Sequence, residues 1–144
     1  MSLRLSVAIL ALILSGTVLG TAGCRASGSD THLLDGSAWR LRAWQLSSLA
    51  PGEFTITAKF ADGRISGNSA VNVYGGPYGA GPGDAFSVGR LAVSAMGGTG
   101  PRMRAEQTYL TLLGEATSFK RSGDRLTLFD QHGNASLVFQ AAKP

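Results

Sequence analysis

Few side chains in this 144-residue sequence have the types and spacing that catalysis or metal binding requires. One cysteine, Cys24, cannot form an internal disulfide or a multi-thiolate metal site, and two histidines, His32 and His132, are too few for a histidine-rich centre. No hydrolase motif accompanies either histidine, and carboxylates such as Asp62 and Asp84 stand alone in the sequence. We therefore expect no enzymatic activity, no cofactor and no metal.

The single cysteine can instead be acylated. It follows an apolar segment of about ten residues, 5–14, and Arg4 supplies a positive charge before that segment. A membrane span needs about 20 apolar residues, so the pattern indicates a bacterial export signal instead. Residues 21–24 (Thr-Ala-Gly-Cys) resemble the lipobox of bacterial lipoproteins, in which a cysteine is acylated and becomes the mature N-terminus.

We therefore predict a lipoprotein signal peptide over residues 1–23, lipidation of Cys24, a tether over 24–32 and a folded domain over 33–144. The exported protein would be anchored to the cell membrane or the outer membrane, because two or three acyl chains hold a protein stably on a bilayer. Two alternatives remain: an uncleaved N-terminal membrane anchor, and an ordinary signal peptide cleaved near residues 20–23.

The overall composition argues against disorder and against nucleic-acid binding. The chain is 44% hydrophobic and 15% charged, which is too apolar for a disordered protein, and its 20 glycines indicate many turns or bulges. Its 13 basic residues exceed its 9 acidic residues only mildly, and they are scattered without interleaved aromatic residues. A β-rich domain that does not bind nucleic acid is expected.

Alternation of apolar and polar residues predicts strands with one buried face. The strand predicted over residues 37–44 has Trp39, Leu41 and Ala43 on that face. The strand over 54–60 buries every second residue: Phe54, Ile56, Ala58 and Phe60. Asp62 and Gly63 form a hairpin turn into 64–68, and further strands are predicted over 70–74, 85–94 with a bend at Gly89, 117–121, 125–129 and 135–140.

One helix is predicted over residues 101–113, between two sets of strands. Pro101 suits the first turn, and a stripe at helical spacing contains Met103, Gln107, Leu110 and Leu113 or Gly114, broadened by Tyr109 and Leu112. The glycine-rich residues 75–83 match no phosphate-binding motif and are predicted to be a loop. Because tight turns join antiparallel neighbours, the fold class is α+β, mainly antiparallel β: a curled sheet or partly open barrel with one helix packed against it.

Several motifs together resemble a known family. They are WRL at 39–41, FADGRISG at 60–67, NVYGGPY at 72–78, Met96, the helix residues Glu106, Tyr109, Leu110 and Leu113, and LTL at 126–128. In this order and spacing they resemble the META domain of HslJ-type bacterial heat-shock lipoproteins. The resemblance implies an exported, often lipidated domain without recognised enzymatic activity and with a loose association with stress, drug tolerance or virulence.

The sequence departs from this family at two cysteine positions. Family members usually have Gly-Cys-Asn where this chain has Ala70-Val71-Asn72, and a second cysteine where it has Gly98. Since both cysteines are replaced together, the resemblance implies that positions 71 and 98 are spatial partners.

Four residues are candidates for a structural or binding role: Asn72, Tyr74, Tyr78 and Glu106. Asn72 stands where the family keeps asparagine, and its amide can close a turn by bonding to the backbone. Tyr74 is expected in the core, although it could line a groove, and Tyr78 is expected at the surface. Glu106 is expected to pair with Arg102 or to reach the sheet, without a catalytic role.

Two functional hypotheses follow. The first is a non-enzymatic META-domain lipoprotein that supports stress or drug tolerance in the cell envelope by contact with another envelope component. The second is a pilotin-like module that binds an acyl chain or hydrophobic peptide inside its barrel. An apolar cavity of roughly a few hundred Å³ between helix and sheet would favour the second hypothesis, and a filled core would favour the first. In both, the membrane is a partner through the lipid anchor.

Overall fold

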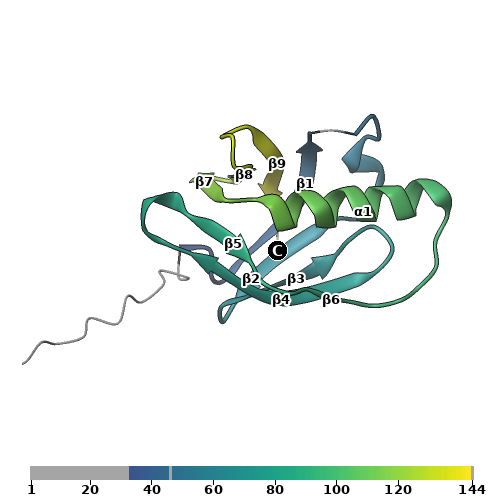
Figure 1. Cartoon of the computed structure of the whole chain (residues 1–144), viewed down its shortest axis with the longest axis horizontal. Coiled ribbons are helices and arrows are strands. Elements are labelled where there is room, and N and C mark those ends of the chain that lie inside the picture. The colour runs from purple at the N-terminus through teal and green to yellow at the C-terminus, as the bar shows by residue number, and fades with distance from the viewer. Residues whose placement is uncertain (1–32, 46, 144) are drawn as a thin grey trace, which may run out of the picture.

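Nine antiparallel strands and one helix make up the computed structural model, which describes residues 33–45 and 47–143 (Figure 1). The strands are β1 (Ser37–Trp44), β2 (Thr57–Ala61), β3 (Arg64–Asn68), β4 (Val73–Ala80), β5 (Phe86–Val88), β6 (Ala92–Val93), β7 (Ser118–Ser122), β8 (Arg125–Phe129) and β9 (Ala135–Ala141). The helix α1 spans Gly100–Glu115, and short 3₁₀ turns span Pro51–Glu53 and Pro82–Asp84. The predicted signal peptide, Cys24 and the tether lie outside the described residues.

The sheet curls into a nearly closed barrel with one seam. Its strand order is β5-β4-β3-β2-β1-β9-β8-β7, and β6 pairs with β4 beside β5. The two end strands approach each other at one point, where Ala85 and Ser118 form an isolated bridge and the Phe86 amide donates to the Thr117 carbonyl at 2.9 Å. The predicted fold class, mainly antiparallel with one helix packed against a curled sheet, is confirmed.

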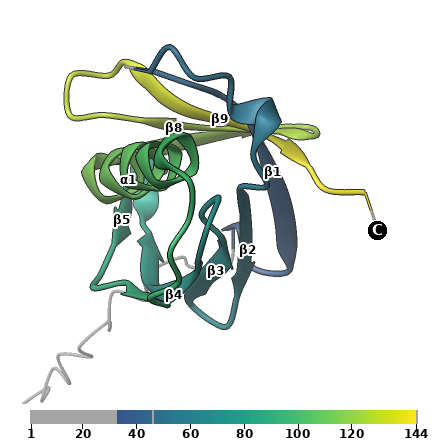
Figure 2. The same ribbon diagram turned by 90° about the vertical axis from the view of Figure 1, so that its right-hand side faces the viewer.

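The helix lies against the inner face of this sheet, between the β8–β9 side and the β4–β5 side (Figure 2). Its buried face consists of Ala105, Glu106, Tyr109, Leu112 and Leu113. The predicted stripe was partly right: Tyr109, Leu112 and Leu113 are buried. Met103 and Gln107 are exposed and Leu110 is half-buried, so the true inner face is rotated about the helix axis from the predicted one. Within the part of the chain that the structure describes, no helix is both long and apolar enough to cross a membrane.

Aromatic rings fill the interior and cross the seam. Phe60 on β2 contacts Tyr78 on β4 edge-on, with 4.8 Å between ring centroids. The ring centroids of Phe86 on β5 and Phe119 on β7 lie 6.3 Å apart. This ring contact joins the two end strands next to their single bridge. Such edge contacts stabilise a core by about 1 kcal/mol beyond the burial of apolar area. The open seam is therefore closed by side chains as well as by the helix.

The strand predictions are confirmed with local differences. Phe54, Ile56, Ala58 and Phe60 are all buried as predicted, although β2 begins only at Thr57. The hairpin turn has positive φ at both Asp62 (52°) and Gly63 (69°), as a type I′ turn requires. The last three strands agree with prediction to within one residue, and the predicted 85–94 strand is divided into β5 and β6 around Gly89.

Two predictions about individual segments were wrong. Ala43 is exposed, because the β1–β9 register shifts between Leu41 and Ala43 and interrupts the alternation. Most of residues 75–83 form strand β4 instead of a loop, and its inward face alternates Tyr74, Gly76, Tyr78 and Ala80. Glycine is needed at Gly76, because a Cβ atom there would lie 2.6 Å from the Arg90 carbonyl oxygen on the neighbouring chain segment.

Candidate functional site

The most concentrated polar cluster in the described part of the chain surrounds the carboxylate of Glu106. This carboxylate projects from α1 toward the turn between β3 and β4, and Glu106 as a residue is only 6% exposed. One of its oxygens accepts hydrogen bonds from the Ser69 hydroxyl at 2.6 Å and from the Asn72 amide N–H at 2.8 Å. The other oxygen accepts from the Asn72 side-chain amide at 2.8 Å. Glu106 therefore joins the helix to the β3–β4 turn, which is the second of the two predicted arrangements.

Asn72 extends this network to a third segment, the connection between β6 and α1. Its side-chain oxygen accepts from the Met96 backbone N–H at 2.7 Å and from the Ser94 hydroxyl at 2.9 Å. Its backbone carbonyl accepts from the Ser69 N–H at 2.8 Å, which closes the turn. We call these five residues, Ser69, Asn72, Ser94, Met96 and Glu106, the Glu106 network. It holds three segments that are distant in the sequence in one arrangement.

The charge on Glu106 is stabilised by these donors. Burial by itself raises the pKa of the Glu106 carboxyl, but the hydrogen bonds from Ser69, from Asn72 and from the Val71 backbone together outweigh burial and lower the pKa below its ordinary value. An ionised carboxylate only accepts hydrogen bonds. With both oxygens occupied by donors and no proton to give at neutral pH, Glu106 is suited to fixing structure and not to general acid–base chemistry.

A second connection between β4 and α1 runs beside this network. The Tyr74 hydroxyl donates to the Thr57 carbonyl at 2.9 Å and lies 2.6 Å from the Tyr109 hydroxyl. Since the single Tyr74 proton goes to Thr57, Tyr109 is the donor in that pair. Tyr74 is the second residue of β4 and follows Asn72 by two residues, and Tyr109 follows Glu106 by three residues on the helix, so the two connections lie side by side. Burial raises the pKa of Tyr74 and Tyr109, and both stay protonated.

Gly67 makes the close approach of β2 and β3 in this region possible. A Cβ atom at Gly67 would lie 2.1 Å from the Thr57 carbonyl oxygen, the same oxygen that accepts from Tyr74. The turn that follows β3 is strained, because Ala70 has φ of 91°, in a region that favours glycine. The family's glycine at this position thus has a conformational reason, and this chain accepts the strain.

The prediction that Tyr78 lies at the surface was wrong. Tyr78 is buried at 5% exposure, and its hydroxyl donates to the Asp35 carboxylate at 2.6 Å. The same carboxylate oxygen accepts from the Gly63 amide at 3.4 Å. Burial and the Asp35 charge both raise the pKa of Tyr78. Tyr78 thereby ties the start of the domain to β4, and it does not belong to the Glu106 network.

The two positions where the family has cysteines are neighbours. A Cβ atom built on Gly98 would lie 2.7 Å from Cγ2 and 3.1 Å from Cγ1 of Val71. Val71 is half-buried and immediately precedes Asn72, while Gly98 follows Met96 by two residues. The predicted spatial pairing is confirmed, and it lies at the edge of the Glu106 network.

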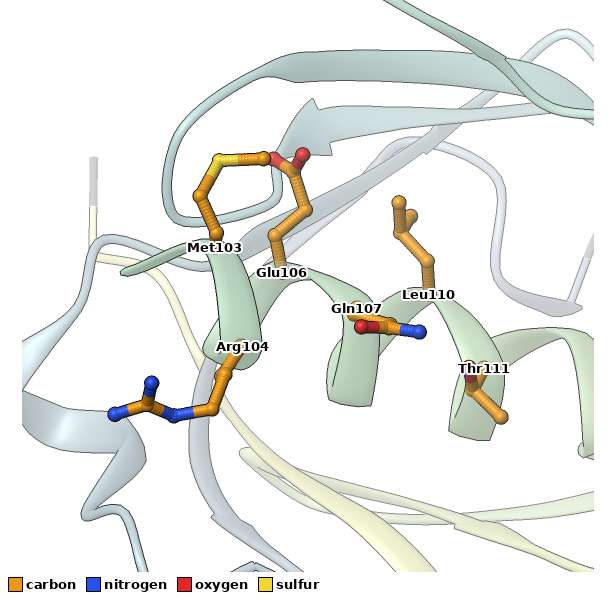
Figure 3. A pocket seen from close by; sticks show the side chains of 6 residues that line it. All are labelled: Met103, Arg104, Glu106, Gln107, Leu110 and Thr111. Atoms are coloured by element: carbon orange, nitrogen blue, oxygen red, sulfur yellow. The ribbon is translucent and has the colours of Figure 1, made fainter. Parts of the chain in front are cut away.

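Several apolar side chains near this network are exposed. Four large apolar side chains are exposed there, from the start of β4, from β6, from the following connection and from the first turn of α1: Val73 (56%), Val93 (39%), Met96 (58%) and Met103 (40%). An open depression of about 560 Å³ adjoins the helix here. In Figure 3, Met103, Glu106 and Leu110 project from one side of α1, and Arg104, which also lines the depression, projects from the other side.

The remaining polar candidates do not converge on a site. His132 is exposed in the β8–β9 turn, where the Asp130 carboxylate accepts from the His132 and Asn134 amides. Within the described residues, no group of three or more His, Cys, Asp or Glu is placed to hold a metal ion. Of the four candidates from the sequence, Asn72 and Glu106 meet directly and Tyr74 lies beside them. Ser69, Ser94 and Tyr109 were missed, because isolated serines carry no motif and Tyr109 was assigned only to packing.

Comparisons with known proteins agree with this architecture. An NMR structure of a protein from Burkholderia xenovorans is 26% identical with a TM-score of 0.63, covering 79% of this chain and 87% of that chain. Another NMR structure is 17% identical with a TM-score of 0.57, covering 76% and 92%. The crystal structure of a DUF4847 family protein from Bacteroides vulgatus is 11% identical with a TM-score of 0.58, covering 78% and 97%.

Sequence comparison establishes the family of this chain. A search of curated proteins found no match. The family model of the META domain matches residues 32–143, a range that contains all the described strands and the helix. The chain therefore belongs to the META domain family.

Proposed function

We propose that this chain is a non-enzymatic, lipid-anchored module of the bacterial envelope that supports tolerance of stress or drugs by contact with another envelope component. The proposal that the chain is not an enzyme is supported by the burial, charge and hydrogen bonding of Glu106. Its carboxylate is buried, ionised and fully engaged by Ser69 and Asn72. A catalytic carboxylate would need a free oxygen facing a substrate and a pKa near the working pH.

The packing between helix and sheet supports this proposal over the pilotin-like alternative. Tyr109 and Leu113 on α1 and Phe139 on β9 are all at most 1% exposed, and the Tyr109 and Phe139 rings lie 6.3 Å apart. These side chains occupy the space in which an acyl chain would have to lie. The exposed apolar residues beside the Glu106 network are instead of the kind that contact another molecule at the surface.

The lipid anchor rests on the sequence around Cys24, the one cysteine of the chain, which follows an apolar segment of export-signal length. Anchoring places the domain at a membrane, where its contacts would be made. An enzyme with a soluble substrate would not need the anchor, whereas a module that acts by contact with another envelope component would.

Complementation of a deletion strain tests the proposal. We expect the strain to lose tolerance of envelope stress or of drugs, the wild-type gene to restore it, and Cys24→Ser to restore little at equal protein level. Restoration by Cys24→Ser to the wild-type level, or a deletion strain as tolerant as its parent, would contradict the proposed role.

A further inference from the structure

The outer face of the barrel carries a row of exposed cations. Arg40 on β1 pairs in register with Gln140 on β9, and Gln140 pairs with Arg125 on β8. Adjacent strands are about 4.8 Å apart, so the two arginines leave the sheet about 10 Å from each other, on either side of Gln140. Both are exposed, and both point away from the core, since their neighbours Leu41 and Leu126 are buried.

Further positive charges extend this row. Arg42 follows two residues after Arg40, Lys59 lies on the adjoining strand β2, and Lys143 follows β9; all three are exposed. We call Arg40, Arg42, Lys59, Arg125 and Lys143 the cationic face. It spans strands β8, β9, β1 and β2, on the opposite side of the sheet from α1.

A shallow depression of about 600 Å³ lies within this face. Its lining contains three cations and one carboxylate: Arg40, Arg42, Lys143 and Asp124, together with Thr57, Gln140, Ala141 and Ala142. The Asp124 carboxylate already accepts a hydrogen bond from the Gln140 side chain. The lining therefore has a positive balance and suits an anionic occupant.

The position of the face relative to the predicted anchor indicates which anion it meets. The described domain begins at Leu33, four residues before β1, the strand that carries Arg40 and Arg42. The predicted tether of residues 24–32 can span at most about 30 Å when extended. A lipid on Cys24 would thus keep this face within reach of the headgroups, and the surface of an anionic membrane attracts clustered basic residues. No aromatic residue lines the depression, which gives no stacking platform for nucleic-acid bases.

We propose that the cationic face docks on the headgroups of anionic phospholipids and so fixes how the domain lies on the membrane. The location of the face depends on the lipid anchor of the proposed function, but the binding itself does not. The α1 side, with its exposed apolar residues, would then be turned away from the bilayer and be free for another envelope component.

The test compares partitioning of the full chain onto vesicles of phosphatidylcholine alone and onto vesicles that also contain phosphatidylglycerol. The ratio of the two partition coefficients isolates the electrostatic part, because any N-terminal apolar segment contributes to both. The double variant Arg40→Gln/Arg42→Gln removes two charges from the cationic face. Its matched control, Arg102→Gln/Arg104→Gln, removes two exposed charges from α1 on the other side of the sheet.

Each basic residue near an anionic bilayer contributes about a fivefold preference, so the ratio should fall about 30-fold in Arg40→Gln/Arg42→Gln and at most a fewfold in the control. The wild-type ratio should also fall as salt is raised above about 0.1 M, where the screening length is about 10 Å. A wild-type ratio near one, equal losses in both double variants, or binding to duplex DNA or an acidic polypeptide but not to vesicles would overturn the proposal. Absence of acylation at Cys24 would contradict the proposed function and leave this ratio unchanged.

Discussion

Restoring the pair of cysteines that this chain lacks should create a disulfide with little movement of the backbone. The Cβ position of Gly98 lies 2.7 Å and 3.1 Å from the two Cγ atoms of Val71. The two Cβ atoms are therefore at most about 3.5 Å apart, at the short end of the range of about 3.5–4.5 Å for disulfides. Gly98 does not have the positive φ that would strain a cysteine. The perturbation is Val71→Cys with Gly98→Cys, in a Cys24→Ser background that removes the competing thiol.

The expected gain in the free energy of unfolding follows from the length of the loop that the disulfide would close. A loop of about 28 residues lowers the entropy of the unfolded chain enough to raise the free energy of unfolding by about 3.6 kcal/mol. Loss of the half-buried Val71 side chain removes about 1 kcal/mol of that gain. The net stabilisation of about 2.5 kcal/mol corresponds to a rise in Tm of about 10 °C for a domain of this size.

Thermal unfolding of the oxidised and reduced double variant, with thiol titration, measures this effect. Reduction should abolish the gain. The single variant Gly98→Cys should unfold more easily than the wild type, because its new Cβ atom would lie against Val71. Two free thiols per chain after oxidation, or an oxidised form that melts no higher than the reduced form, would refute the spatial pairing of the two positions.

The remaining predictions concern the groups that hold α1 and the hairpins together, and denaturant titration measures each free energy of unfolding. Glu106→Gln should destabilise the domain by about 3 kcal/mol, because an amide donor replaces an acceptor that faces other donors, whereas the exposed Glu115→Gln should change it by less than about 0.5 kcal/mol. The folded pKa of Glu106 lies below its ordinary value of 4.5. Its contribution is therefore complete well above pH 4.5 and lost as the pH falls through the folded value, and Glu106→Gln should show less of this acid sensitivity; identical pH slopes would contradict the assignment. Gly67→Ala should cost about 3 kcal/mol through the 2.1 Å clash with a backbone oxygen, while Gly114→Ala on the helix, with open space around it, should stabilise by about 0.5 kcal/mol. Equal effects of the two alanines would rule out the close approach at β2. Tyr74→Phe should cost about 1.5 kcal/mol by leaving a buried carbonyl unpaired, and a neutral result would show that water replaces the hydroxyl.

Local patterns predicted most of the elements. The alternation from Phe54 to Phe60 places four side chains in the core, because every second residue of this extended segment faces inward. The Asp62-Gly63 turn and the last three strands follow from residues that tolerate positive φ, such as Gly123 and Gly133 in the turns. Where the structure obeys short-range rules of this kind, the sequence alone was sufficient.

The errors arose where distant segments determine the local structure. Strand β4 contains Gly75, Gly76 and Pro77, which disfavour strands by local propensity, yet the close approach of the Arg90 backbone requires glycine at Gly76. The two-residue spacing of Tyr74, Gly76 and Tyr78 was the available signal, and the glycines concealed it. The orientation of α1 was missed for a related reason: Glu106 counts as polar by periodicity, but its partners at Ser69 and Asn72, more than 30 residues away, make burial favourable.

The residues of the candidate site were also predicted only in part, for the same reason. Asn72 and Glu106 were identified from their type and family position, and their direct contact could be found only in three dimensions. Tyr78 was assigned to the surface because its glycine- and proline-rich neighbours indicate a loop. Its partner Asp35 and the edge contact with Phe60 place it in the core instead.

The intact mass of the protein purified from membranes of an expressing bacterium tests the central claim, a lipid-anchored envelope module, most directly. We predict a chain that begins at Cys24 and carries the mass of two or three acyl chains. A chain of the unprocessed mass, or one cleaved near residues 20–23 without any lipid increment, would contradict it.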